Sequence, residues 1–163
     1  MDSISVSGTG CAARTAGWDR SIWRRAGAAA LLFATLGGAA APGTLEISLA
    51  NLRSQKGMIR LCLTVAPRNF PECGDDRAAI TRSVRTADGV IHIGGLPSGE
   101  YALALIHDAN GNGKLDTFAG IPTEGIGFSR NPTLGFGPPK FAAAQFAIGS
   151  GTTGQTVKMK YFL

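Results

Sequence analysis

Residues 100–107 read Glu-Tyr-Ala-Leu-Ala-Leu-Ile-His, the pattern of a strongly apolar strand. Tyr101, Leu103 and Leu105 would share one face of this strand, because side chains alternate between the two faces of an extended chain. The other face would carry two alanines and Ile106, so that neither face is polar. A strand that is apolar on both faces is typical of the centre of a sheet. We therefore expect residues 100–107 to be the central strand of the fold.

Shorter strand patterns, separated by turn residues, lie on both sides of this stretch. The dipeptide Asp88-Gly89, for example, has the composition of a hairpin turn. The expected strands are 45–49, 58–65, 78–87, 90–93, 100–107, 141–148 and 157–161. About seven short strands without a clear amphipathic helix predict an all-β fold, an antiparallel β-sandwich of the immunoglobulin-like or prealbumin-like kind.

The segment at 141–148, Phe-Ala-Ala-Ala-Gln-Phe-Ala-Ile, fits two secondary structures. Three successive alanines favour a helix, whereas the two phenylalanines and Ile148 suit a strand. We favour a strand and keep the helix as the alternative. The glycine-rich stretch 149–154 that follows has the composition of a turn.

Residues 107–139 (HDANGNGKLDTFAGIPTEGIGFSRNPTLGFGPP) show no sustained helical or strand period. Long irregular segments in compact domains are usually functional or disordered. Aromatic residues argue against disorder here, because solvated linkers are poor in them. We expect one long ordered loop, in which Phe118, Phe128 and Phe136 form a small core of their own.

Oxygen-bearing side chains recur at alternate positions at the start of this loop. Asp108, Asn110, Asn112 and Asp116 occupy relative positions 1, 3, 5 and 9, and a glycine follows the third of them. Calcium takes about 6–8 oxygen ligands from carboxylates, amides and backbone carbonyls. In this register Lys114 would contribute its backbone carbonyl. The pattern predicts a calcium loop with these five residues as metal ligands.

Two observations keep a metal-free alternative open. An EF-hand loop has a bidentate glutamate at its twelfth position, where this chain has Ala119, and no amphipathic helix flanks the loop. Asn and Asp side chains also bond to their own backbone, and the repeated Asn-Gly pairs at 110–113 are turn signals without any metal. The stretch 108–116 is therefore either a calcium site on a β scaffold or a set of Asx-turns.

Residues 1–41 have the layout of a secretory signal peptide. A basic region around Arg24 precedes an apolar run at 26–36, and small residues follow it. The run is shorter than the roughly 20 residues that a membrane-spanning helix needs. We expect cleavage near residues 40–41 and one mature domain at 42–163 without a transmembrane segment. The expected location is the bacterial periplasm or the medium.

Export also bears on the two cysteines of the mature domain, Cys62 and Cys73. An even number of cysteines in an exported chain favours a disulfide, and two free or metal-binding thiols are the alternative. Cys62 lies on the face of its strand opposite to the apolar residues, so the bridge would lie away from the main core. The whole chain has a formal net charge of +5, but its basic residues are scattered, so we expect no nucleic-acid partner.

Residues with catalytic chemistry are few, and we assign no catalytic residue. His107 and Asp108 are adjacent, so in a strand they would point to opposite faces, with His107 bonding a backbone carbonyl at the strand end. Ser129 lacks the strand–turn–helix setting of a nucleophilic serine. Glu124 could pair with Arg130 or reach a cation, but we favour a solvated surface role. The candidate ligand or interaction surface consists of His107, Glu124, Phe128, Ser129 and Arg130.

The chain resembles the bacterial DUF2141 family in three segments, 95–116 (GLPSGEYALALIHDANGNGKLD), 120–129 (GIPTEGIGFS) and 136–141 (FGPPKF). The similarity extends over about 44–162. It departs from the family at Ala109, where an acidic residue is common and its loss removes a charge that could face a cation. The resemblance implies an exported bacterial protein without an assigned reaction. The segment LPSGEY is also similar to the strand entry of prealbumin-like modules, such as carboxypeptidase regulatory-like domains.

Two classes of function follow from these patterns. The first is an exported, non-enzymatic β-sandwich protein whose long loop binds calcium or forms a surface for an envelope protein or glycan. The alternative is a periplasmic hydrolase that acts on envelope material through the loop at 107–130. A pocket beside His107, with a carboxylate within hydrogen-bond reach, would favour the hydrolase.

Overall fold

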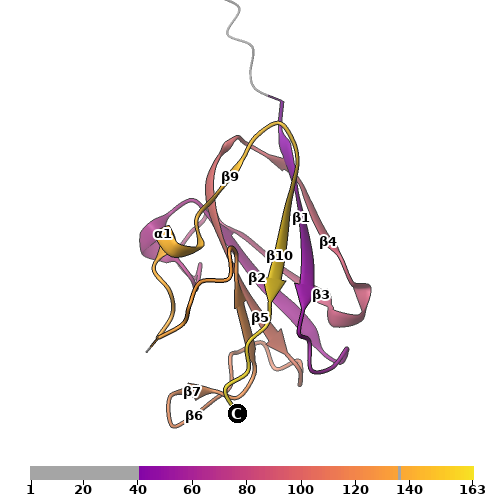
Figure 1. Cartoon of the computed structure of the whole chain (residues 1–163), viewed down its shortest axis with the longest axis vertical. Helices are drawn as coiled ribbons and strands as arrows, with labels where there is room; N and C mark the ends of the chain where they lie inside the picture. Colours follow the sequence, from indigo (N-terminus) through magenta and orange to yellow (C-terminus); the bar gives the residue numbers. More distant parts are fainter. Residues whose placement is uncertain (1–40, 136) are drawn as a thin grey trace, which may run out of the picture. The chain divides into compact units, whose positions relative to one another are not determined.

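The computed structural model describes residues 41–135 and 137–163, which belong to one compact unit (Figure 1). The expected signal peptide, apart from Ala41, lies outside the described residues. The described part is mostly β, with ten strands, one four-residue α-helix and two 3-10 turns. The all-β prediction is thus confirmed, and the finer immunoglobulin-like or prealbumin-like assignment stays a prediction. No helix among the described residues has the length and apolarity to cross a bilayer.

A three-stranded sheet joins the two ends of the domain. Its order is β10 (Gly151–Lys158), β1 (Gly43–Ala50) and β4 (Ile91–Leu96). β1 and β4 pair antiparallel, but β1 and β10 pair parallel along their whole length. This parallel pair differs from the expected antiparallel arrangement. A parallel pair needs a long connection, and here nearly the whole domain lies between the two strands.

The second sheet is built around the predicted central strand. Its order is β3 (Ile80–Arg85), β2 (Met58–Thr64), β5 (Gly99–Asp108) and β8 (Gly125–Phe128), and β9 (Phe146–Ile148) pairs with the start of β5. All of these pairings are antiparallel. β5 is buried along most of its length, which confirms the prediction made from its two apolar faces.

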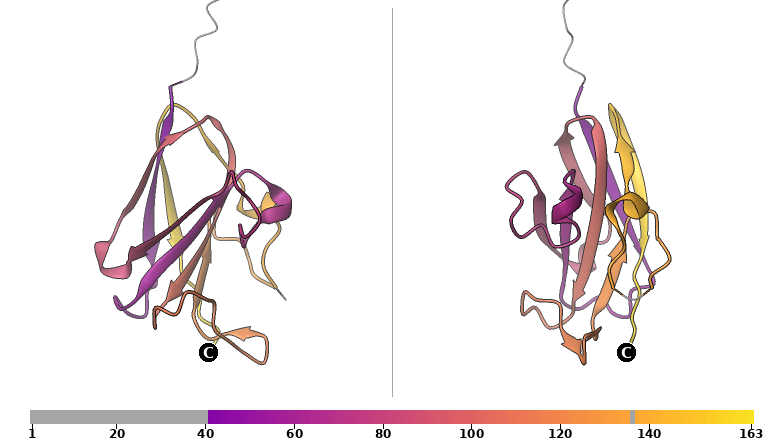
Figure 2. Two further views of the ribbon diagram at one scale, coloured as in Figure 1. Left: turned by 180° about the vertical axis from the view of Figure 1, so that it is seen from behind. Right: turned by 90° about the vertical axis from the view of Figure 1, so that its left-hand side faces the viewer.

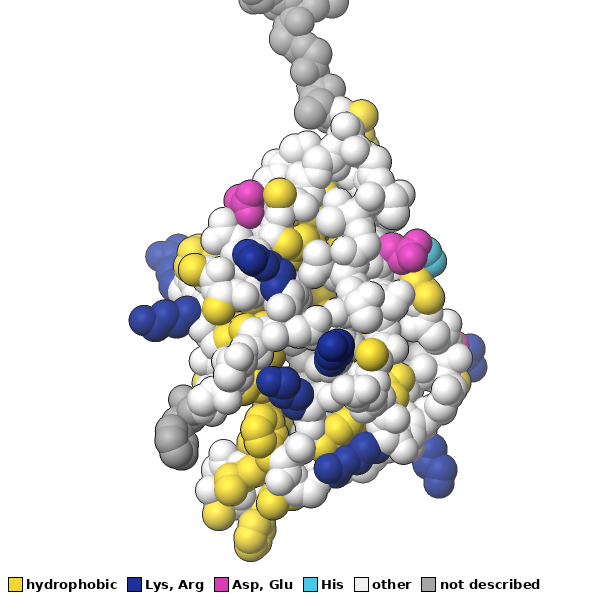
Figure 3. All heavy atoms as spheres, in the orientation of Figure 1, with side chains coloured by type: hydrophobic (Ala, Val, Ile, Leu, Met, Phe, Trp, Pro, Cys, Tyr) yellow, Lys and Arg dark blue, Asp and Glu magenta, His cyan; other side chains and the backbone are white. Residues whose placement is uncertain are grey.

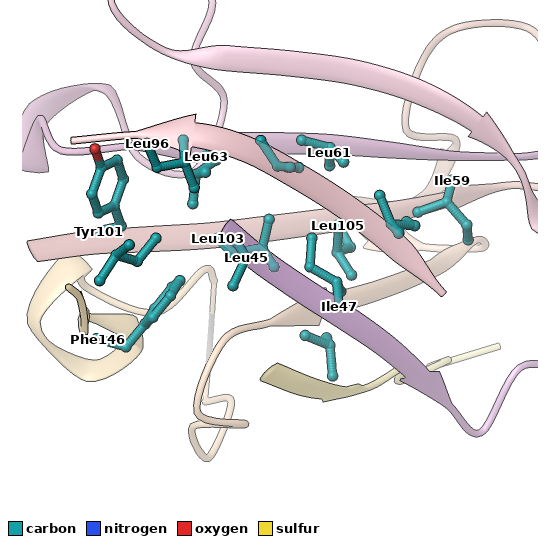
Figure 4. Packing of buried hydrophobic residues seen from close by; sticks show 14 of the residues in the cluster. Leu45, Ile47, Ile59, Leu61, Leu63, Leu96, Tyr101, Leu103, Leu105 and Phe146 are labelled. Carbon is teal, nitrogen blue, oxygen red and sulfur yellow. The ribbon is translucent and has the colours of Figure 1, made fainter. Parts of the chain in front are cut away.

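The main core lies where the two sheets face each other (Figure 4). Leu45 and Ile47 of β1 and Ile93 of β4 are fully buried in it, together with Ile59 of β2 and Leu103 of β5. Each such side chain contributes roughly 1.5–3 kcal/mol when it is removed from water. The alternation of apolar side chains along β1, β2 and β5 therefore determines which face of each strand turns inward.

A smaller apolar cluster covers the outer face of the second sheet. Cys62 and Cys73 form a disulfide there with their Cα atoms 5.8 Å apart, as predicted from the even number of cysteines in an exported chain. Phe70 contacts the rings of Phe128 and Phe141 edge-on, with centroids 5.9 and 6.0 Å apart. The cluster is closed by two short segments that contact each other, α1 (Phe141–Ala144) and η1 (Pro67–Asn69), seen in the right panel of Figure 2.

Several predicted boundaries are wrong, and in each case the backbone pairing gives the reason. β10 begins at Gly151, inside the predicted turn 149–154, because it pairs with β1 residue by residue from Gly43 onward. The segment 141–148 divides into one helical turn and the strand β9, so each alternative holds for half of it. The turn at Asp88 takes the form of a 3-10 turn, η2 (Thr86–Asp88).

The described residues of the stretch 107–139 are ordered, but they do not form one continuous loop. β6 (Thr117–Phe118) and β7 (Ile121–Pro122) form a small hairpin, and β8 joins the second sheet. The predicted aromatic core of the loop is wrong: Phe118 is 71% exposed and Phe128 belongs to the disulfide cluster. Phe136 lies outside the described residues. We name residues 117–122 the hairpin tip.

Candidate functional site

The carboxylate of Asp108 organises the start of the loop from a fully buried position at the end of β5. Its Oδ1 accepts hydrogen bonds from the amides of Gly111 (2.7 Å) and Asn112 (3.1 Å). Its Oδ2 accepts from the amide of Gly113 (2.9 Å) and from Arg60 Nε (2.6 Å). A carboxylate has about four lone-pair sites, so these four donors saturate it.

Arg60 supplies the positive charge that a buried carboxylate requires. Burial alone raises the pKa of Asp108, but the hydrogen bond from Arg60 and the amides of Gly113 and Gly111 outweigh it, so the pKa is lowered from its ordinary value. The guanidinium also donates from Nη1 to Ser83 Oγ at 3.0 Å, which holds it in place. Arg60 lies on the polar face of β2, and the sequence offered no signal that it would reach the loop.

Asn110, Asn112 and Asp116 are brought together just beyond Asp108. Asn110 Nδ2 donates to Asp116 Oδ2 at 2.7 Å, and Asn112 Nδ2 lies 2.9 Å from both oxygens of the same carboxylate. The amide of Asn112 donates to Asn110 Oδ1, and that of Lys114 to Asn112 Oδ1. The Asx-turns of the metal-free alternative are therefore present. No group of three or more His, Cys, Asp or Glu side chains that could hold a metal occurs in residues 41–135 and 137–163.

Glu124 fastens the far end of this turn. It is only 7% exposed, and its two oxygens accept hydrogen bonds from the amides of Ala109 (3.1 Å) and Asp116 (3.2 Å). The amide of Thr123 donates to the carbonyl of Asp116 at 2.9 Å. The predicted solvated role of Glu124 is wrong, because its carboxylate is the partner of backbone amides that would otherwise be unsatisfied.

His107 is 1% exposed and bonds to two groups from distant parts of the chain. Its Nε2 lies 2.9 Å from the carbonyl of Lys56, and its Nδ1 lies 2.7 Å from the hydroxyl of Tyr161. A carbonyl only accepts, so Nε2 donates its proton to the carbonyl of Lys56. This confirms the expected bond to a backbone carbonyl. Asp108 faces the outer side of the sheet and is not a partner of the ring.

Ser129 has a structural role in the same sheet. Its hydroxyl accepts from the amide of Leu103 at 3.0 Å and donates to the carbonyl of Ala144 at 2.5 Å, and the side chain is fully buried. Leu103 lies four residues along β5 from His107, which is about 13 Å at roughly 3.3 Å per residue. Ser129 and His107 are therefore too far apart to act as a catalytic nucleophile and base.

The candidate surface proposed from sequence is only partly a surface. His107, Glu124, Phe128 and Ser129 are all buried, and Arg130 alone is exposed. Within the described part of the loop, the exposed large apolar side chains are instead Phe118, which was predicted to lie in a small core, and Ile121, for which no role was predicted. The signal in the sequence for this hairpin was Gly120, because the turn Ala119-Gly120 between the two residues has positive φ at both positions and glycine adopts positive φ readily.

These features define a mostly β domain with one disulfide and a loop held by two buried carboxylates. The chain belongs to the DUF2141 family, described as an uncharacterized protein conserved in bacteria, whose sequence profile matches residues 47–156. The match runs from β1 to β10 and includes the whole loop, so it confirms the resemblance seen in the sequence. No curated protein and no solved structure matches the chain.

Proposed function

We propose that this protein is an exported, non-enzymatic binding module of the bacterial envelope that contacts its partner through the hairpin tip. The observation that carries the proposal is the exposure of Phe118 (71%) and Ile121 (44%) on an ordered hairpin. Large apolar side chains that stand together in water mark interaction sites more often than scattered single ones. The glycan and protein partners expected from sequence remain candidates alongside other envelope components.

The way the tip is held supports a binding role. Asp108 and Glu124 fix the chain on both sides of the turn through backbone amides, and Asp116 accepts from the amide of Thr123. The tip therefore reaches its partner already ordered. Preorganisation of this kind lowers the entropy that binding must overcome.

Export is supported by the disulfide as well as by the leader. Disulfides persist in oxidising compartments and are rare in the bacterial cytosol. The Cys62–Cys73 bridge closes a loop on the outer face of the sheet. Cell fractionation and the mass of the mature amino terminus test this part: a full-length cytosolic chain would contradict it.

The bonding of the polar side chains in the loop supports a non-enzymatic role over the hydrolase alternative. His107 and Ser129 are buried and each bonds to backbone or to Tyr161, so neither offers a free base or nucleophile. Glu124 binds two amides with its two oxygens. These engagements are the reason for placing a non-enzymatic role first.

Calcium is the second candidate, favoured by one specific observation. The side-chain ends of Asn110, Asn112 and Asp116 converge within 2.9 Å. If the side-chain amides of both asparagines rotated by about 180°, their oxygens would lie beside those of Asp116. The carbonyl of Lys114 and water would then complete the coordination shell of a calcium ion. Asp108 would join as a ligand only if Arg60 moved away, because the guanidinium holds one of its oxygens.

A melting series tests the calcium candidate. Binding at this loop raises the melting temperature through linkage, and EDTA reverses the rise. The variant Asp116→Asn should abolish the rise, whereas Asp75→Asn, at an exposed position elsewhere, should keep it. An unchanged melting temperature at millimolar calcium removes the metal from the proposal.

The binding role is tested by cross-linking in living cells of the native host. A photo-reactive residue replaces Phe118, and the matched control replaces Val65, which is 49% exposed after β2. The proposal expects adducts at position 118, whether protein, glycan or lipid, and their loss when Ile121→Ser is added. If position 118 yields no more adduct than position 65, the proposal fails.

A further inference from the structure

The hairpin tip does not stand alone at its end of the domain. Figures 1 and 2 both place the β6–β7 hairpin beside the segment that follows β10, at the end where β5 finishes. That segment carries Phe162, which is 45% exposed. Figure 3 shows hydrophobic side chains gathered at this end, with Lys and Arg side chains beside them on the same face.

Basic residues converge on this end from three separate segments. Asp108 ends β5 and pairs with Met58, so the β1–β2 connection lies at this end. Lys158 ends β10 and pairs with Ala50, so β10 also ends here. The third segment is the start of the loop after β5, which carries Lys114. We name the basic residues of these segments the cationic end; they are Arg53, Lys56, Lys114, Lys158 and Lys160.

These cations are not neutralised by neighbouring carboxylates. The ion pairs in the described part of the chain are Arg60–Asp108, Arg85–Asp88 and His92–Glu46, and none involves the cationic end. Two of its members have other partners. Arg53 stacks 4.3 Å from the ring centroid of Tyr161 and donates from Nη1 to an oxygen of Leu163, and Lys160 Nζ donates to the carbonyl of Pro132 at 3.4 Å. The side chains of Lys56, Lys114 and Lys158 are exposed, so their charges face solvent.

Two of the three acidic residues nearest to the tip are buried. Glu124 accepts from two backbone amides and Asp108 is neutralised by Arg60. Asp116 is half-buried and accepts from the side-chain amides of two asparagines, which carry no charge. The opposite end of the second sheet carries Glu72, Asp75, Asp76 and Glu100 together with Arg68, Arg77, Arg130 and Lys140, so its charges balance. An excess of positive charge at one end orients a protein in the field of an anionic surface.

We propose that the hairpin tip and the cationic end together bind the surface of a lipid bilayer that contains anionic phospholipids. Phe118 and Ile121 enter the boundary between headgroups and acyl chains, while the lysines and arginines contact lipid phosphates. Apolar insertion and basic charge together give the firm attachment that neither gives alone. This inference rests on the proposed binding role and names its partner.

The shape of the tip favours a membrane over a protein as the occupant. The tip projects as a two-stranded hairpin and carries its apolar side chains outward. An open hollow of about 690 Å³ does exist on the domain, but it is lined by residues such as Phe70, Phe141 and Gln145 near the start of β5, away from the tip. A protruding apolar hairpin beside basic residues is suited to a soft, anionic interface.

Vesicle sedimentation tests the proposal with the protein purified as its host processes it from the full-length chain. Vesicles of phosphatidylcholine with about a third phosphatidylglycerol should bind it at least ~10-fold more tightly than phosphatidylcholine alone, because several cations contribute. Raising sodium chloride from about 0.1 M to about 0.5 M should weaken binding, since salt screens surface charge. Equal binding to both kinds of vesicle, or none to either, overturns the proposal.

Matched variants locate the interaction. Phe118→Ser combined with Ile121→Ser should reduce binding at least tenfold, and Lys114→Gln about fivefold. The controls Val65→Ser and Lys140→Gln change an exposed apolar residue and an exposed lysine away from the tip, and should leave binding unchanged. An equal loss in variants and controls, at unchanged melting temperature, counts against the proposal.

Failure of this inference can be told apart from failure of the binding role. If vesicles do not bind but position 118 forms protein or glycan adducts in cells, the tip is a binding site and the membrane is the wrong partner. If about 10 mM inorganic phosphate abolishes vesicle binding at constant ionic strength, the site recognises free phosphate and the bilayer is again the wrong partner. If neither vesicles nor adducts are found, both proposals fall.

Discussion

Arg60 Nε lies 2.6 Å from Asp108 Oδ2, diagonally across the neighbouring strands β2 and β5. The carboxylate is fully buried and the arginine side chain is 31% exposed. A positive side chain thus occupies the charge-neutralising position that a metal ion would take at the first residue of a calcium loop. The charge of the buried carboxylate is thus balanced by a side chain of the same domain.

Removing one partner of this pair should destabilise the domain strongly. Asp108→Ala leaves Arg60 and three amides without their acceptor, and we expect a loss of about 3 kcal/mol in the free energy of unfolding, measured with urea. Arg85→Ala breaks an exposed pair and should change it by about 0.5 kcal/mol or less. Equal effects of the two variants would show that Asp108 does not organise the loop.

The same carboxylate predicts an acid-sensitive loop. Because its pKa is lowered on folding, the stability it contributes is present above the pKa of the unfolded chain, about 3.9, and is lost as the pH falls through the lower folded value. The free energy of unfolding should therefore decline below about pH 4. The decline should be shallower in Asp108→Asn than in the wild type. Parallel pH profiles for the two proteins would contradict this assignment.

Glu124 should control the order of the loop more than the stability of the sheets. Glu124→Ala leaves the amides of Ala109 and Asp116 unpaired, at a cost of about 2 kcal/mol. Amide hydrogen exchange should rise within 109–124 and stay slow in the strands β2 and β5. Glu100→Ala, at an exposed position, serves as the control, and exchange that rises uniformly would argue against a local clamp.

Gly57 should tolerate no side chain. Its φ is 78°, and a Cβ there would lie 2.2 Å from the carbonyl oxygen of Asp108. We expect Gly57→Ala to cost about 3 kcal/mol or more. Gly111 has a similar φ of 75° but open space around it, so Gly111→Ala should cost only about 1 kcal/mol of backbone strain. Chemical denaturation of the two variants separates steric conflict from conformational strain.

Local alternation predicted much of the scaffold correctly. The central strand, the outward position of Cys62 and the opposite directions of His107 and Asp108 all follow from the two-residue period of an extended chain. Side chains in the loop could not be placed in this way. Glu124 and Ser129 look like surface residues in sequence, and only the packing of β8 against β5 shows that both are buried.

The amino-acid sequence by itself determined the central strand, most of the other strands of the two sheets and the turn-forming start of the loop, because these depend on neighbours a few residues apart. The disulfide followed from the even number of cysteines in the expected mature chain. Tertiary structure decided which groups meet at that loop. Arg60 and Asp108 are 48 residues apart in the chain, and His107 and Tyr161 are 54 apart. Only strand pairing and sheet packing bring such residues together, and the same packing leaves Phe118 and Ile121 in water.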